Sequence, residues 1–265
     1  MVEEAEPLII DLHLRSIKNK TLFVPLTDPI MILYSVADYV VNRLDMSPKL
    51  YVRLPGMQST MLAVKGAAVH PIVIFGAAGL PLMVLRTPPR IGEEAFKLYS
   101  YLAKVIVDWA ERNEFERIVM IDVKPATSED SKVYFVTEEK LVEKIAGMGF
   151  TPYSGIFTSE ASFFLDECLR SRVDAILFIV ESKKVKILLD AYRKRSPEAV
   201  ERALQSVAEH DEEAVGNAIK ALSKVSGVNI PLDRLPDFIK EVSEALKESI
   251  PQLARRARPS TFGIA

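Results

Sequence analysis

The first half of the chain consists of short apolar segments separated by glycine, proline and polar residues. Segments of this length that are rich in valine, isoleucine, leucine and phenylalanine predict strands, here at 7–14, 21–27, 50–54, 60–66, 71–77 and 81–87. The links between the last four are short, so we expect antiparallel hairpins. Gly76 to Gly79 is interpreted as a hairpin turn, although its backbone N–H groups could also approach a ligand.

Two segments of this half have helical periodicity. Asp28 followed by Pro29 is a helix start signal, because aspartate accepts free backbone N–H groups and proline at the first position loses no bond. This helix is expected to continue to Leu44 and to end before Ser47 and Pro48. The longest predicted helix spans 93–112, and its apolar positions are spread widely around it. That spread predicts burial against the sheet on one side and against a second subunit on another.

In the second half, strand and helix patterns alternate. Continuous apolar runs at 117–123 and 174–181 are typical of central parallel strands covered on both faces. Between them we expect a strand at 132–136, a helix capped by Thr137 that ends at the turn Gly147 to Gly149, and a helix at 159–170. This order predicts a three-layer α/β/α sandwich with a mixed sheet.

After residue 183 only helical periodicity remains. Two sets of apolar positions recur at helical spacing, namely Val215, Ala218, Ile219, Leu222 and Val225, and Leu235, Phe238, Ile239, Val242 and Leu246. We therefore divide the chain into an α/β sandwich domain (1–195), a helical C-terminal extension packed on it (196–252) and a flexible tail (253–265).

Composition narrows the classes of function. The chain has 265 residues, of which 49% are hydrophobic, so it can bury a large core. A formal net charge of −2 argues against nucleic-acid binding, which usually needs a basic face. The most apolar window, 70–85, is too short and too rich in glycine and proline to span a membrane. We expect a cytoplasmic protein, and the scarcity of glutamine beside abundant charge favours a thermophilic archaeal source.

Signatures of common active sites are missing from the sequence. The histidines His13, His70 and His210 are far apart, and the single cysteine, Cys168, sits among apolar residues, as expected of an inert buried thiol. There is no Gly-x-Ser-x-Gly elbow and no Walker loop. We therefore expect no metal, no cofactor and no catalytic residue that can be named, which makes an enzyme the less favoured class.

Two groups of residues are candidates for binding. Ligands of open α/β sheets lie beyond the carboxyl ends of the strands, which nominates a cleft formed by Arg86, Asp122, Lys124, Glu160 and Glu181. Charged residues also gather there simply because strands leave the core for water. In the tail, Arg255, Arg256 and Arg258 could pair with acidic groups of a partner or be merely solvated.

Three stretches, 133–150, 151–182 and 196–235, together resemble the proteasome assembly chaperone family of the Pac-two type. The resemblance implies a fold similar to that of purine nucleoside phosphorylases without their active site, and self-association into rings or small oligomers. It also implies that the partners are proteins, since some members chaperone assembly of the proteasome α ring. Archaeal members that do so end in a hydrophobic residue, tyrosine and one further residue. This chain ends Phe262-Gly263-Ile264-Ala265, so Phe262 and Ile264 are the candidate apolar anchors of a docking tail.

The sequence thus favours a non-enzymatic homo-oligomer that binds proteasome α subunits or a family paralogue. Two alternatives stay open. One is an enzyme or ligand sensor with a nucleoside-phosphorylase-like cleft at the strand ends. The other is a structural paralogue that only hetero-oligomerises with a tailed member of the family.

Overall fold

The computed structural model describes residues 8–11, 20–26, 32–53, 62–64, 67–69, 72–87, 93–129, 131–157, 159–194, 198–199, 202–203, 206 and 211–244. For 8–11, 62–64, 67–69, 93–96 and 98 the description is of the backbone. The helices are α1 (Ile32–Arg43), α2 (Glu93–Arg112), α3 (Glu139–Gly147), α4 (Ala161–Leu169), α5 (Lys183–Arg193) and α7 (Glu212–Ser226). A further helix spans 235–244.

Nine strands form one mixed sheet in the order β1-β3-β6-β7-β2-β8-β11-β9-β10. They are β1 (Leu8–Asp11), β2 (Lys20–Pro25), β3 (Ser47–Arg53), β6 (Val73–Gly76), β7 (Leu82–Arg86), β8 (Phe115–Pro125), β9 (Val133–Thr137), β10 (Thr151–Pro152) and β11 (Asp174–Ser182). The central strands β7, β2, β8 and β11 are parallel, whereas β3 and β6 pair antiparallel with their neighbours. Strand β9 pairs antiparallel with β11 and parallel with β10. The predicted mixed sheet is confirmed.

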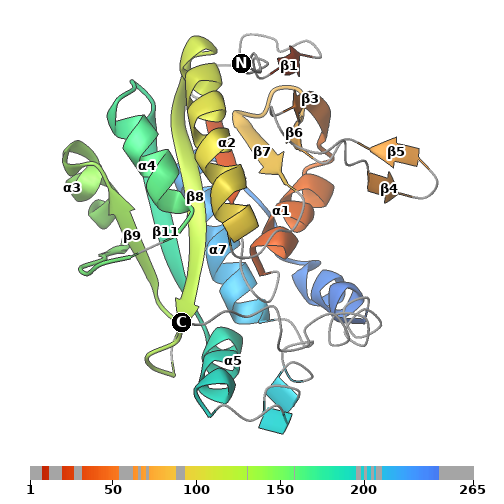
Figure 1. The fold of residues 1–265 in the computed structure, drawn as a ribbon, viewed down its shortest axis with the longest axis vertical. Helices are drawn as coiled ribbons and strands as arrows, with labels where there is room; N and C mark the ends of the chain where they lie inside the picture. Colours follow the sequence, from red (N-terminus) through yellow and green to blue (C-terminus); the bar gives the residue numbers. More distant parts are fainter. Residues whose placement is uncertain are drawn as a thin grey trace, which may run out of the picture.

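Helices cover both faces of the sheet, so the predicted α/β/α sandwich is confirmed (Figure 1). We call the face under α2 and α4 the first face; there the Tyr99 ring of α2 packs edge-on against Phe164 of α4, with centroids 6.3 Å apart. We call the opposite face, under α1 and α7, the second face. Arg117 of β8 points to this face and donates to the Val225 carbonyl at the end of α7 over 2.7 Å.

The continuous apolar runs of β8 and β11 are buried because helices cover both faces of the sheet. Along β8, alternate side chains point to opposite faces, and Ile118, Val119, Met120 and Ile121 are all fully buried. The run in β11 is buried from Ala175 to Ser182. A strand with one wet face would instead alternate apolar and polar residues. The two predicted central strands are therefore confirmed.

Several local predictions are also confirmed. The helix α2 has the predicted bounds, Glu93–Arg112. Gly149 follows the end of α3 with φ +86°, a left-handed conformation that glycine adopts without strain, and Gly79 has φ +80° in the turn between β6 and β7. The two Gly-containing segments are thus turns, as their sequences indicated.

Two local predictions were wrong, and one strand begins earlier than predicted. Thr137 does not cap α3: the cap residue is Glu138, and the Thr137 hydroxyl donates to the Ala175 carbonyl of β11 at 2.6 Å. The helix α1 ends at Arg43, before Ser47 and Pro48 as predicted, but the strand predicted at 50–54 begins at Ser47. The segment around 60–66 does not join the main sheet: β4 (Leu62–Val64) pairs with β5 (Ala67–Val69) in a separate two-stranded sheet. The start signal Asp28–Pro29 lies outside the described residues.

The C-terminal helices pack against the sandwich. The predicted apolar set of α7, from Val215 to Val225, is buried on the second face. The helix at 235–244 lies against α1, where Phe238 and Tyr39 pack edge-to-face with ring centroids 5.2 Å apart. Whether 196–252 is a separate unit stays a prediction.

Candidate functional site

The parallel strands β7, β2, β8 and β11 end at one edge of the sheet, where the candidate cleft was predicted. Lys124 of β8 is paired in register with Glu181 of β11, so both side chains point to the first face. Asp122, two residues before Lys124, points the same way and lies near Glu160, which precedes α4. The structure thus places these four predicted residues on one face of one edge.

Glu181 and Lys124 form an ion pair at 3.3 Å in which the carboxylate is fully buried. Its oxygens also accept from the Thr127 hydroxyl at 2.6 Å and from the Lys132 backbone N–H at 3.2 Å. Burial by itself would raise the pKa of Glu181, but these two donors and the Lys124 ammonium together hold that pKa below its usual value. A carboxylate that stays ionised, with its acceptor positions occupied, is a poor general base.

The pKa of Asp122 shifts in the opposite direction to that of Glu181. Burial raises the pKa of Asp122, the Ser159 hydroxyl and the Val123 backbone N–H oppose that rise, and the nearby Glu160 carboxylate adds to it. The N–H of Val123 lies 2.7 Å from an Asp122 oxygen, and Ser159 and Glu160 are both buried. A carboxyl group with a raised pKa is the kind of group that proton transfer requires.

Arg86 lies apart from the other four candidates, on the second face. Strand alternation places its side chain with those of Leu82 and Val84, under α1. There its guanidinium donates to the Tyr34 hydroxyl at 2.7 Å and lies 3.2 Å from an Asp38 oxygen. Burial raises the pKa of Asp38, and the Arg86 charge partly offsets the rise. The sequence could not reveal this separation because it depends on which face each strand end presents.

An aromatic cluster borders Lys124 and was not predicted. The Lys124 ammonium lies 3.8 Å from the Tyr134 ring centroid and 5.5 Å from that of Tyr153, a cation–π arrangement. The Tyr153 and Phe157 centroids are 6.5 Å apart, and the neighbouring Ile156 is 95% exposed. Only the pairing of β9 with β10 brings Tyr134 and Tyr153 together, so no local signal could have identified the cluster.

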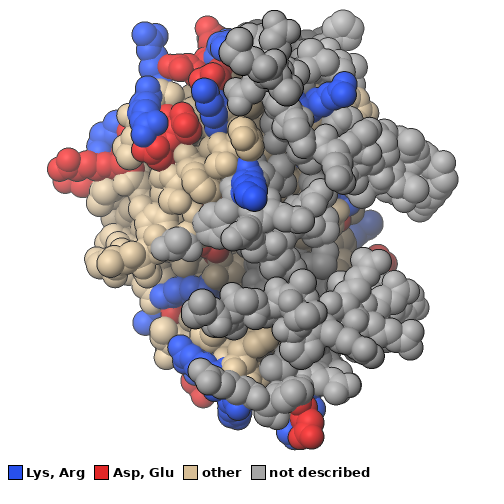
Figure 2. All heavy atoms as spheres, in the orientation of Figure 1, with Lys and Arg blue, Asp and Glu red and all other residues tan. Residues whose placement is uncertain are grey.

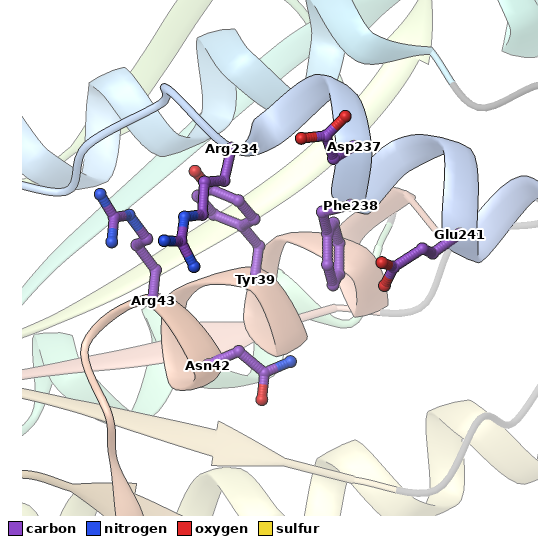
Figure 3. A pocket seen from close by; sticks show the side chains of 7 residues that line it. All are labelled: Tyr39, Asn42, Arg43, Arg234, Asp237, Phe238 and Glu241. Atoms are coloured by element: carbon purple, nitrogen blue, oxygen red, sulfur yellow. The ribbon is translucent and has the colours of Figure 1, made fainter.

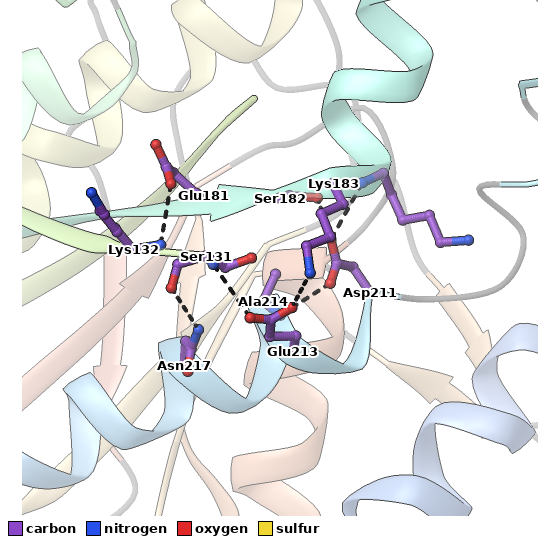
Figure 4. A network of polar contacts seen from close by, with 10 residues as sticks. Ser131, Lys132, Glu181, Ser182, Lys183, Asp211, Glu213, Ala214 and Asn217 are labelled. Atoms are coloured by element: carbon purple, nitrogen blue, oxygen red, sulfur yellow. Dashed lines mark hydrogen bonds and ion pairs between the residues drawn. The ribbon is translucent and has the colours of Figure 1, made fainter. Parts of the chain in front are cut away.

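Polar contacts also join the sheet edge to the helices of the second face (Figure 4). Asp211, which caps α7, accepts from the Ala214 N–H at 3.1 Å and from the Ser182 hydroxyl at 2.7 Å. Ser182 in turn caps α5 by accepting from the Val185 N–H at 3.1 Å. The end of β11 and the starts of α5 and α7 are therefore held by one buried pair of side chains.

Two surface hollows lie on the second face. The first, of about 280 Å³, lies between α1 and the helix at 235–244 (Figure 3). The Tyr39 hydroxyl there donates to the Pro231 carbonyl at 2.7 Å, and Arg43 pairs with Asp233 at 2.7 Å. Its lining carries both charge signs, with Arg234 beside Asp237 and Glu241. We therefore interpret this hollow as the surface gap between two packed helices.

The second hollow is a groove of about 420 Å³ between α7 and the strands β9 and β10. Three lysines line it: Lys132, which immediately precedes β9, and Lys220 and Lys224 of α7. The Phe150 ring lines it as well. No aspartate or glutamate is among its lining residues within the described part of the chain. The charge of this groove therefore differs from that of the described surface in Figure 2, where both signs are interspersed.

The remaining sequence-based expectations have mixed outcomes. Cys168 is fully buried, and burial raises the pKa of its thiol to about 12, as expected of an inert thiol. No group of three or more potential ligands could hold a metal among the described residues, and no described helix is long and apolar enough to cross a membrane. His13, His70, His210, Arg255, Arg256, Arg258, Phe262 and Ile264 lie outside the described residues.

The sequence model of the PAC2 family matches residues 22–250, which is most of the chain. The chain belongs to the PAC2 family. The resemblance seen in its sequence is thereby confirmed at the level of the family. No curated protein sequence is a significant match.

Solved structures with the PAC2 fold are similar over nearly the whole chain. Pyrococcus furiosus PbaA, an archaeal homolog of proteasome-assembly chaperone, is 15% identical with a TM-score of 0.71, covering 96% of this chain and 100% of that one. A protein of unknown function from Thermoplasma acidophilum is 20% identical with a TM-score of 0.70, covering 90% and 88%. P. furiosus PbaB, an archaeal proteasome activator, is 14% identical with a TM-score of 0.65, covering 92% and 99%. At these identities the likeness confirms the fold.

Proposed function

We propose that this PAC2 protein is a non-enzymatic, self-associating binding protein that assists or regulates assembly of the proteasome through its α subunits. The observation that carries the proposal is the match to the PAC2 family over residues 22–250, together with similarity in fold to PbaA and PbaB. A paralogue of the same family is the other partner that this reading allows, with the chain acting as the structural member of a mixed oligomer.

The pairing of charged side chains at the carboxyl ends of the parallel strands supports a binding function over a catalytic one. Glu181 is neutralised by Lys124 and saturated by hydrogen bonds, and Arg86 is engaged by Tyr34 and Asp38 on the opposite face. Charged side chains that satisfy one another are typical of structural ion pairs. The exposed Ile156 beside the aromatic cluster is the kind of apolar position that a protein partner covers.

Native mass spectrometry tests the proposal. The protein is measured alone and after mixing with purified α subunits of the proteasome from its own source. We expect a discrete homo-oligomer that forms a mixed species with the α subunits. A protein that stays monomeric and leaves the α subunits unbound contradicts the proposal.

The tail gives a second test. We propose that Phe262 and Ile264 anchor the chain in a pocket of its partner, with Arg255, Arg256 and Arg258 pairing with acidic groups around that pocket. A chain that ends after Leu253 should then fail to capture α subunits, while the number of subunits in its own homo-oligomer stays the same. Undiminished capture by the shortened chain contradicts docking through the tail.

The alternative, a small-molecule site in a nucleoside-phosphorylase-like cleft, has one observation in its favour. Asp122, whose raised pKa comes mainly from burial, lies beside Ser159 and Glu160 at the strand ends. Thermal unfolding with and without nucleosides and nucleotides tests it, because a ligand that binds only the native state raises its stability by RT ln(1 + [L]/Kd). An Asp122→Ala chain is the matched control, since a rise in melting temperature at this site should be lost in it.

A further inference from the structure

The groove between α7 and the strands β9 and β10 carries positive charge that the described residues do not neutralise. Lys132, Lys220 and Lys224 are all exposed. Within the described part of the chain, none of the three forms an ion pair with a carboxylate. Lys224 donates to the Met148 carbonyl across the groove, which leaves its charge uncompensated. Three like charges gathered around one hollow repel one another, and an anionic occupant would relieve that repulsion.

The groove also has an apolar wall. The Phe150 ring is held against Phe178 of β11, with centroids 4.7 Å apart, and the Lys224 ammonium lies 5.5 Å from the Phe150 centroid. Val133 and Ala221 complete this wall. The chemistry of the site thus suits a segment in which carboxylates flank a small apolar side chain.

The edge of β10 is poorly suited to binding a partner by addition of a further strand. Among the described residues β10 is the last strand of the sheet, and the Tyr153 N–H just after it points inward, donating to the Phe135 carbonyl at 2.9 Å. Alternation along the strand turns the position of Pro152 outward, and proline has no N–H to donate. An occupant is therefore held by side-chain contacts with the lysines and Phe150.

We propose that this groove receives the acidic segment 1–7 of a second copy of the chain. That segment reads Met-Val-Glu-Glu-Ala-Glu-Pro, so Glu3, Glu4 and Glu6 surround Ala5 and follow Val2, with no lysine or arginine among them. The other terminal segment, with Arg255, Arg256 and Arg258, has the wrong charge for this site. The inference deepens the proposed self-association and rests on it.

The topology makes the contact intermolecular. Segment 1–7 precedes β1, and β1 and β10 lie at opposite ends of a nine-stranded sheet. Eight strand spacings amount to roughly 38 Å along the sheet, whereas seven fully extended residues reach about 25 Å. A contact that joins one end of a subunit to the other end of the next is heterologous, and such contacts close into rings when the rotation allows.

Binding of a synthetic peptide tests the chemistry of the groove. A fluorescent peptide with the sequence of residues 1–8 is titrated with the full chain, and a peptide of residues 252–261 serves as the basic control. We expect the acidic peptide to bind, with affinity falling about tenfold between 50 and 500 mM salt because exposed charges are screened. K220E, which removes no contact within the described residues, should weaken binding by about fivefold. Failure of the acidic peptide to bind overturns the proposal.

A charge swap tests the occupant. One chain carries K132E/K220E/K224E and another carries E3K/E4K/E6K, and each should lose the native oligomer mass. A third chain that carries all six substitutions should regain it, because every groove then meets a segment of opposite charge whatever the number of subunits. K186E/K194E/K240E, three exposed lysines outside both the groove and α2 with the same change in net charge, should keep the oligomer. Circular dichroism confirms that each variant is folded.

The outcomes separate this inference from the proposed function. An oligomer that survives in both reversed chains overturns docking of segment 1–7 and leaves capture of α subunits untouched. Loss and recovery of the oligomer as described, without capture of α subunits, supports docking and overturns the proposed role in proteasome assembly. A wild-type chain that is monomeric overturns the docking inference together with the self-association on which it rests.

Discussion

Replacing Asp211 by alanine should destabilise the protein more than any exposed substitution near it. Asp211 is 6% exposed and accepts from Ala214, Ser182 and the Lys184 N–H. Loss of a helix N-cap costs about 1 kcal/mol. The buried Ser182 hydroxyl, left without an acceptor, adds about 1–2 kcal/mol. The sum, about 2–3 kcal/mol, corresponds to a fall in Tm of roughly 5–10 °C for a domain of this size.

Calorimetry of Asp211→Ala, Asp211→Asn and Lys183→Ala measures this effect. Asparagine caps helices about as well as aspartate but offers one acceptor atom instead of two, so Asp211→Asn should lie between wild type and alanine. Lys183→Ala removes the exposed pair with Glu213, 2.9 Å apart, and should leave Tm unchanged. Equal melting temperatures for wild type and Asp211→Ala would refute the argument that one buried carboxylate holds β11, α5 and α7 together.

Three further predictions concern the pH dependence, the thiol and the C-terminal helix. The raised pKa of Asp122 means that ionisation of this carboxyl destabilises the folded protein. This cost is absent below about pH 3.8, where the group is protonated in both states, and complete above the pKa of the folded state. In urea melts at pH 7, Asp122→Asn should therefore be more stable than wild type, and an equally large gain at pH 3 would contradict this. The buried Cys168, with a pKa of about 12, should react with a thiol reagent at pH 8 only after unfolding by urea, and rapid reaction of the native protein would show the assignment to be wrong. Phe238→Ala should cost about 1–2 kcal/mol and expose 235–244 to protease by removing the contact with Tyr39, whereas the exposed control Lys240→Ala should not; equal protease resistance of both chains would contradict docking through Phe238.

Most of the architecture was predictable from the chain itself. The runs that became β8 and β11, the bounds of α2 and the buried set of α7 follow from local periodicity, which depends on residues close in sequence. The wrong predictions were those that depended on partners far along the chain. The Thr137 hydroxyl donates to the Ala175 carbonyl of another strand instead of capping a helix, and nothing within 60–66 indicates that β4 pairs away from the main sheet.

For the candidate site, the sequence by itself determined which residue types stand at the strand ends and that no metal or nucleophile motif accompanies them. Tertiary structure alone decided which of them meet. Lys124 and Glu181 are neighbours because two parallel strands are in register, Arg86 is remote because its strand presents it to the other face, and Lys132 joins Lys220 and Lys224 because α7 crosses beneath β9. The physical reason is that side-chain direction within an element is local, whereas adjacency between elements depends on pairing, register and packing over the whole chain.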